Sequence, residues 1–285
     1  MIVESRLARF LLRLGTLLTL VFVYLPLAVI ALYAFNKTRT QTWPIPGLTV
    51  RWFERAIHNH GARDALLTSV KAAVGATAFA LVLGTFASFA VQRYRFFGRE
   101  TISLLVILPI ALPGIVTGMA LNATFREVLS PFGLGLGLFT VIVGHATFCI
   151  VVIYNNVLAR LRRISRSLEE ASMDLGADTW QTFRFVTLPT LRTALLAGSL
   201  LAFALSFDEV IVTRFTAGSQ ETLPLWILTN LSRPNQLPIV NVVAIAVVLL
   251  SAIPVYLAQR LSHEAAGAAA PAGAAAATQA AGARQ

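Results

Sequence analysis

Two adjacent carboxylates, Asp208 and Glu209, interrupt an apolar run in the last third of the 285-residue chain. A charge inside a membrane costs on the order of 2.5 kcal/mol or more unless it is paired or hydrated. Either the acids are structural, in an ion pair or at a helix end near the outer interface, or one of them lines the path of a cationic substrate. Because adjacent helical positions differ by about 100°, both acids cannot face one pore.

A second group of polar side chains lies in residues 160–189, the longest polar interval of the carboxyl half. Ser167 and Glu170 have the spacing of a capping box, which predicts a short helix over residues 168–175. Gly176 is suited to the left-handed stop of that helix. Asp178 and Gln181 then offer a second helix start, and the second helix runs towards Val186.

Two short helices joined at a glycine form a compact protrusion. Leu168, Ala171 and Leu175 share one face of the first helix, at positions i, i+3 and i+7. This face can receive a soluble partner. It can equally lie on the lipid surface, helped by the arginines of residues 160–166. Physical reasoning from the sequence leaves both interpretations open.

The motifs of familiar hydrolases are absent from the sequence. It contains no phosphate-binding GxxxxGK[ST] loop, no HExxH and no GxSxG. Its one cysteine, Cys149, lies in an apolar run, so neither a disulfide framework nor a thiolate metal site is expected. We therefore predict that the chain is not an enzyme, with no catalytic residue, no metal ligand and no cofactor of its own.

Composition predicts an integral membrane protein. Apolar residues make up 56% of the chain and charged residues 13%, whereas soluble domains have roughly 25% charged residues. The net charge of +10 does not indicate nucleic-acid binding, because the lysines and arginines lie in short connections between apolar runs.

Six apolar runs are long enough to cross a lipid bilayer as helices. They cover residues 14–35, 72–91, 101–125, 138–158, 193–212 and 239–258. The first run is too long for a cleaved signal peptide. Pro109 and Pro113 are expected to kink the third. His145 in the fourth is expected to be a hydrogen-bonded packing residue, and Gly114 and Gly118 an intramolecular helix contact.

The basic residues orient the predicted spans. With a cytoplasmic amino terminus, 14 lysines and arginines lie inside and 9 outside, and the dense cluster after the fourth span lies inside. Both termini are then cytoplasmic. We predict a cytoplasmic segment at residues 1–13, a six-span domain at residues 14–259, and an Ala- and Gly-rich disordered cytoplasmic tail at residues 260–285.

The polar interval resembles the EAA loop of binding-protein-dependent ABC importer permeases. The similarity rests on Glu170-Ala171-Ser172, on Gly176 after three residues, and on Val186-x-Leu188-Pro189 after nine more. Serine replaces the motif's second alanine, and valine replaces its isoleucine. The resemblance covers residues 59–260 and implies an all-α membrane fold with six transmembrane helices, of the MetI-like type I class, with the EAA coupling loop at residues 160–189.

The resemblance also implies site residues and partners. Glu170, Ala171, Ser172 and Gly176 would dock on a cytosolic ABC ATPase dimer, and Leu188 and Pro189 would fix the entry into the fifth span. ATP would be bound by that partner subunit. A second permease would complete the pore, and an extracytoplasmic binding protein would deliver substrate. The implied location is the bacterial inner membrane, with the lipid bilayer as surroundings and no nucleic-acid partner.

The residues around the two acids look like the spermidine/putrescine branch of these permeases. That branch typically shows Ser-x-Asp-Asp/Glu where this chain has Ser206-Phe207-Asp208-Glu209. Permeases for iron, thiamine, phosphonate or opine-like solutes share much of this local sequence and remain alternatives. A stand-alone secondary transporter is a further alternative, although the sequence shows no convincing inverted repeat.

Overall fold

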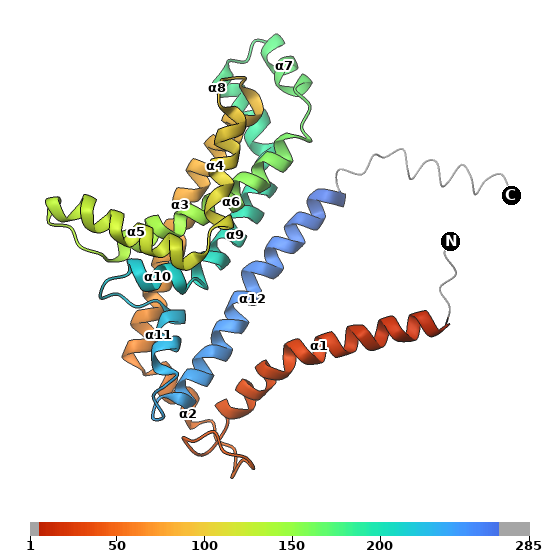
Figure 1. Ribbon diagram of the computed structural model, residues 1–285. Helices are drawn as coiled ribbons and strands as arrows, with labels where there is room; N and C mark the ends of the chain where they lie inside the picture. Colours follow the sequence, from red (N-terminus) through yellow and green to blue (C-terminus); the bar gives the residue numbers. More distant parts are fainter. Residues whose placement is uncertain (1–5, 268–285) are drawn as a thin grey trace. The chain divides into compact units, whose positions relative to one another are not determined.

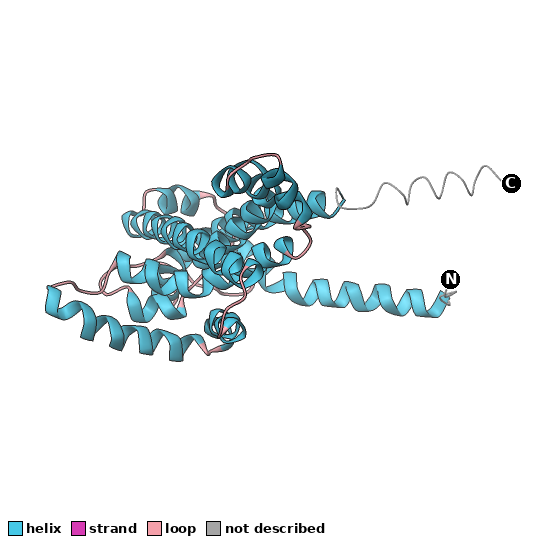
Figure 2. Cartoon of the chain, turned by 90° about the horizontal axis from the view of Figure 1, so that it is seen from above, coloured by secondary structure: helices cyan, strands magenta, loops and turns pink. Residues whose placement is uncertain are grey.

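A computed structural model describes residues 6–267, and their side chains through residue 260; within this range every regular element is helical (Figures 1 and 2). In chain order the elements are α1 (Arg6–Ala34), α2 (Arg51–Ile57), α3 (His60–Arg93), α4 (Arg99–Ala111), α5 (Gly114–Leu129), η1 (Ser130–Phe132), α6 (Leu138–Leu161), α7 (Ser167–Asp174), α8 (Thr179–Thr182), the π-helical turn η2 (Phe183–Thr187), α9 (Leu188–Phe207), α10 (Ile211–Thr216), α11 (Leu223–Asn230) and α12 (Leu237–Gly267).

Five helical runs in the described residues are long and apolar enough to cross a membrane. They are α1, α3, α6, the continuous run Thr179–Phe207, and the part of α12 at Leu237–Arg260. α4 and the following segment Gly114–Phe132, which joins α5 and η1, make a sixth if they are counted together as one bent span. The predicted all-α membrane fold with up to six spans is therefore confirmed, although the third span is not a single continuous helix.

The third predicted span breaks at Pro113. Leu112 is extended, as expected for a residue before proline, and Pro113 precedes α5 with no backbone N–H to donate to α4. The two segments meet at an angle of 106°. Pro109 lies inside α4 without ending it. A kink was expected from both prolines, and the structure places a sharp bend at the second.

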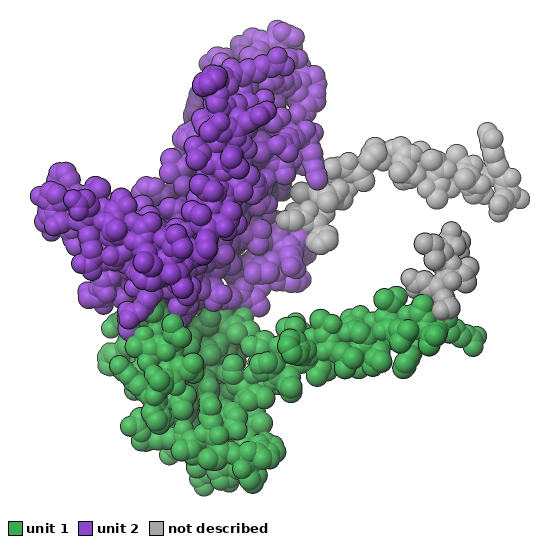
Figure 3. All heavy atoms as spheres, viewed as in Figure 1, with its two compact units in different colours: residues 1–66, 225–250 green, residues 67–224, 251–285 purple. Residues whose placement is uncertain are grey.

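The chain divides into two compact units, shown in separate colours in Figure 3. The first comprises residues 1–66 and 225–250. Its α2 is anchored by Trp52, which is fully buried and donates its indole N–H to the carbonyl of Asn36 at 2.7 Å. Asn36 also forms an isolated antiparallel bridge with Leu48. The connection after α1 is therefore an ordered loop.

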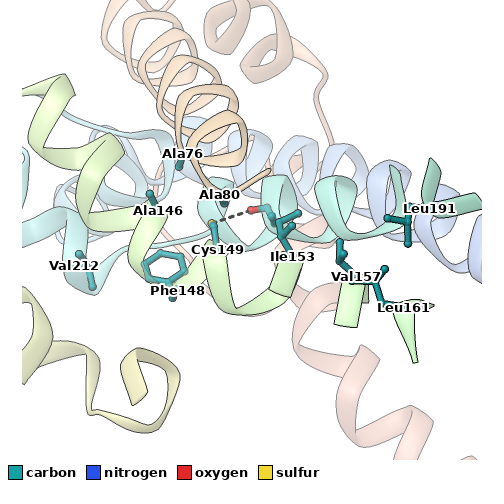
Figure 4. Close-up of a cluster of buried hydrophobic side chains, with 11 residues drawn as sticks. Ala76, Ala80, Ala146, Phe148, Cys149, Ile153, Val157, Leu161, Leu191 and Val212 are labelled. Atoms are coloured by element: carbon teal, nitrogen blue, oxygen red, sulfur yellow. Dashed lines mark hydrogen bonds between the residues drawn. The ribbon is translucent and has the colours of Figure 1, made fainter. Parts of the chain in front are cut away.

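The second unit comprises residues 67–224 and 251–285 and is organised around α6. In this helix 56% of the most apolar window is buried, more than in any other candidate span described. A helix that is apolar on all sides is expected in such a central position. Figure 4 shows its buried cluster, in which Cys149 donates its thiol to the carbonyl of Ala202 on α9. Gly84 permits close packing, since a Cβ there would lie 2.9 Å from the carbonyl oxygen of Ile150.

The ends of the described chain extend the predicted first and last spans. α1 begins at Arg6, so part of the predicted amino-terminal segment is helical. α12 continues to Gly267, so residues 260–267 of the predicted tail are helical as well. The rest of that tail, and residues 1–5, lie outside the described residues.

Candidate functional site

The first short helix of the polar interval ends as its sequence predicts. α7 covers Ser167–Asp174, and Gly176 adopts a left-handed conformation with φ of +92°. The N–H of Gly176 donates to the carbonyl of Met173 at 2.9 Å, and that of Ala177 to the carbonyl of Ser172 at 3.1 Å. These two bonds form a Schellman motif. The prediction of a short helix stopped at Gly176 is confirmed.

The two predicted capping boxes have different outcomes. Between Asp178 and Gln181 the box is complete, with backbone-to-side-chain distances of 2.8 and 2.9 Å in its two directions. The box predicted between Ser167 and Glu170 is wrong. Ser167 is already the first helical residue, and its N–H donates to the side chain of Ser165. The N–H of Glu170, which Ser167 was predicted to accept, donates to the carbonyl of Arg166 at 3.0 Å.

The second short helix runs into the fifth span without a break. α8, η2 and α9 form one helical run, Thr179–Phe207. Pro189 lies in the first turn of α9, where its missing N–H would leave a carbonyl of the preceding turn without a donor. The π-helical register of η2 accommodates this change. The hydroxyl of Thr190 donates to the carbonyls of Val186 and Thr187 at 2.9 and 2.7 Å.

One side of α7 is tied to the rest of the second unit by Glu169. Its carboxylate lies 2.7 Å from the Arg93 guanidinium at the end of α3 and accepts the Thr187 hydroxyl of η2 at 3.1 Å. Arg166 adds a bond of 2.9 Å to the carbonyl of Arg93. Sequence reasoning missed Glu169, because nothing local links it to an arginine 76 residues away.

The residues of the predicted coupling motif lie in and directly after α7 and at the start of α9. Glu170 and Ala171 are exposed, and no hydrogen bond of the Glu170 side chain occurs among the described residues. Ser172 is half-buried, and its hydroxyl lies 3.2 Å from that of Thr182. Leu188 is half-buried and Pro189 exposed at the start of α9. The motif residues are therefore brought together around α7 and the α8–α9 run.

A groove of about 780 Å³ adjoins this cluster. Side chains of α3, α7, α8 and η2 line it, among them Phe86, Phe89, Met173, Trp180 and Phe183, with Arg93 and Glu169 at its polar part. Trp180 stacks on Phe183 with ring centroids 5.7 Å apart. The polar interval thus folds back on α3 as an ordered structure (Figure 1).

The two acids lie in a helix break. α9 ends at Phe207 and α10 begins at Ile211, so the predicted fifth span is present but ends at Phe207, before the two acids, and not at residue 212. Asp208 is exposed, with no side-chain hydrogen bond among the described residues. Glu209 is half-buried, and its carboxylate accepts the N–H of Val212 at 2.9 Å. The structure therefore separates an unpaired acid from one that caps α10.

A further expectation concerns helix packing at two glycines. Gly114 and Gly118 lie against Ile211 and Phe215 of α10, where added Cβ atoms would approach to 3.4 and 2.7 Å. The predicted intramolecular contact is confirmed. Within residues 6–260 no group of three or more His, Cys, Asp or Glu side chains is placed to hold a metal ion.

Comparison with known proteins identifies the family. Residues 80–265 match the family described as binding-protein-dependent transport system inner membrane component. The putrescine transport system permease protein PotI of Escherichia coli K12 is 32% identical over 83% of this chain and 84% of its own. The spermidine/putrescine permease PotC of Haemophilus influenzae is 32% identical over 85% and 93%. The putative 2-aminoethylphosphonate permease PhnV of Salmonella typhimurium is 30% identical over 87% and 91%.

Solved structures share the fold at low identity. A bacterial ABC transporter that imports the polysaccharide alginate aligns with a TM-score of 0.64 and 19% identity, covering 91% of this chain and 98% of that chain. The MetNI methionine ABC transporter aligns with a TM-score of 0.59 and 17% identity, covering 76% and 99%. With the family match over most of the chain, these findings show that the protein belongs to the inner membrane components of binding-protein-dependent transport systems, the permeases of ABC importers.

Proposed function

We propose that this permease forms half of the translocation path of a polyamine importer and receives its energy through α7. A second permease would complete the path, a cytosolic ATPase dimer would bind α7 and hydrolyse ATP, and an extracytoplasmic binding protein would deliver the substrate. Both termini would lie on the cytoplasmic side with α7. The observation that carries the coupling role is that α7 is held on one side by Glu169 and unpartnered on the other.

The free side of α7 has the composition of a protein-binding surface. Leu168 is 52% exposed and Leu175, at the end of α7, is 90% exposed; Glu170 and Ala171 of the same helix are exposed as well. Exposed apolar side chains rimmed by polar ones are typical of an interaction site. A membrane surface is the alternative occupant. However, α7 carries Glu169, Glu170 and Asp174 and no basic residue, which disfavours an anionic lipid surface.

The substrate class is argued from Asp208. An exposed carboxylate at a helix break within an apolar region attracts a cation, and polyamines are polycations. Two relatives are named as permeases for putrescine and spermidine, which are cations of this kind. The relative named for 2-aminoethylphosphonate supports a second candidate. 2-Aminoethylphosphonate carries one ammonium group beside its phosphonate anion, whereas a polyamine carries only positive charges, so the carboxylate of Asp208 favours a polyamine and polyamine import is the better supported function.

The coupling role is tested by Glu170→Lys in the assembled transporter. The matched control is Glu100→Lys, which reverses an exposed acid in the first turn of α4. Glu170→Lys is expected to abolish co-purification of the ATPase and ATP-dependent uptake, whereas Glu100→Lys leaves both. If Glu170→Lys supports normal co-purification and uptake, α7 is not the docking site.

The substrate role is tested by Asp208→Asn and Glu209→Gln, each measured by uptake of labelled putrescine and of 2-aminoethylphosphonate. Asp208→Asn is expected to reduce putrescine uptake at least about tenfold with normal complex assembly. Glu209→Gln keeps an acceptor for Val212 and is expected to have a smaller effect. Unchanged putrescine uptake with Asp208→Asn would return that acid to a structural role, and uptake of the phosphonate alone would assign the second candidate.

A further inference from the structure

His145 occupies a position that the proposed function leaves unexplained. It lies in the first third of α6 with no exposed surface. Its Nδ1 is 2.8 Å from the hydroxyl of Ser206, and its Nε2 is 2.8 Å from that of Thr213. The sequence-based prediction of a hydrogen-bonded packing residue is confirmed. The position of its two partners in the chain indicates a more specific role.

The two partners flank the helix break. Ser206 is the last residue but one of α9, and Thr213 lies in the first turn of α10. The imidazole therefore joins the end of one helix to the start of the next across Asp208 and Glu209. Other side chains of α6 reach only one of these helices: Cys149 bonds to Ala202 of α9, and Thr140 to the carbonyl of Thr216 of α10. Among the described side chains of α6, His145 is the one with hydrogen bonds to both.

The hydrogen-bond roles fit a neutral ring that carries its proton on Nε2. The hydroxyl of Thr213 donates to the carbonyl of Glu209 at 2.8 Å. Its oxygen is then left to accept from Nε2–H of His145, and Nδ1 accepts from the hydroxyl of Ser206. Every polar group of the bridge has a partner in this arrangement. The chain of bonds continues from α6 through Thr213 to the backbone of the break itself.

We propose that His145 is a positioning residue that fixes this break, so that Asp208 faces open space while Glu209 turns back to cap α10. The functional value of this geometry rests on the proposed role of Asp208 in the substrate path. The geometry itself does not depend on that role. Apolar packing alone would hold α6 against both helices but would not specify the orientation of the three-residue break, whereas one hydrogen bond on each side of it does.

The proposal is tested by the accessibility of position 208. Cys149 is the chain's only cysteine, so Cys149→Ala gives a thiol-free background. Asp208→Cys is then introduced and labelled with a small water-soluble methanethiosulfonate in membranes containing the full transporter, and the labelled fraction of this chain is read by mass spectrometry. Adding His145→Leu, which removes both bonds, is expected to lower the labelling rate at least about threefold, because the released break lets side chain 208 leave its open orientation.

Three controls separate positioning from general loosening. Leu205→Cys reports an exposed site on the intact helix α9, and its labelling is expected to be independent of His145. Thr213→Val removes one end of the bridge and is expected to act on position 208 like His145→Leu. Thr140→Val removes a different buried bond between α6 and α10 and is expected to leave the rate unchanged.

Specific outcomes overturn the proposal. A rate at position 208 that is unchanged or increased by His145→Leu contradicts it, as does an equal fall at position 205. Transport plays no part in this measurement. If Asp208→Asn leaves putrescine uptake intact while the labelling result holds, the substrate role fails and the positioning role stands.

Discussion

Replacement of Glu169 by alanine is expected to release α7 from the rest of its unit without unfolding the membrane helices. Glu169 makes two side-chain contacts, an ion pair of 2.7 Å with Arg93 and a hydrogen bond of 3.1 Å from Thr187. The side chains of Arg93 and Glu169 are 11% and 18% exposed. Their interaction is therefore less screened by water than a surface ion pair.

The structure sets the size of the effect. A hydrogen bond to a charged group contributes about 1.5–3 kcal/mol, and truncation also leaves the partly buried Arg93 guanidinium without its counter-charge. We expect a loss of about 3 kcal/mol in the local stability of α7. This corresponds to a roughly 100-fold increase in the equilibrium for local opening.

Hydrogen exchange measured by mass spectrometry on residues 167–187 tests this prediction, since local opening exposes the backbone amides. The matched control is Glu170→Ala, the neighbouring exposed acid without a side-chain partner among the described residues. Glu169→Ala is expected to accelerate exchange in this segment up to about 100-fold, and Glu170→Ala to leave it unchanged. Equal exchange in the two variants would refute the role of Glu169 as the anchor of α7.

Two paired substitutions test the packing described above by thermal unfolding of the purified chain. Gly218→Ala is expected to destabilise the fold by about 1–3 kcal/mol, because Gly218 has φ of +60° and its added Cβ would lie 2.5 Å from the Leu136 carbonyl oxygen. The control Gly98→Ala has φ of +84° but open space around the added Cβ, so it incurs only the conformational cost. Equal losses of stability in the two variants would contradict the clash at Gly218. Trp52→Phe removes the indole hydrogen bond of 2.7 Å and is expected to lower the free energy of unfolding by about 1 kcal/mol. The control Trp43→Phe, at an exposed site, is expected to have no measurable effect. Identical melting curves for the two variants would argue against Trp52 as the anchor of α2.

Local signals in the sequence predicted the polar interval well. Gly176 and the Asp178–Gln181 pair act on the backbone within a few residues of themselves, so their conformations follow from type and spacing. The failed box at Ser167 shows the limit of such signals. Ser165, two residues earlier, offers a competing acceptor, and spacing alone does not decide between them.

Tertiary contacts account for what the sequence left undetermined. Glu169 and Glu170 are equivalent by type, and only the fold brings Arg93 to the first and leaves the second free. The helix break at Asp208 had a local clue in two adjacent acids within an apolar run. Its surroundings had none, because His145, which bonds on both sides of the break, is distant in sequence. Pro109 and Pro113 predicted a kink in the third span, but an angle of 106° depends on what α5 packs against, including Phe215.

The central claim is that this permease transports a polyamine at the expense of ATP hydrolysed by a partner. The most direct measurement is uptake of labelled putrescine into proteoliposomes that contain this chain, its second permease and the ATPase, with the binding protein added outside. We expect uptake that requires enclosed ATP and is lost with Glu170→Lys. Uptake driven by an ion gradient without ATP, or ATP-dependent uptake that is unaffected by Glu170→Lys, would contradict it.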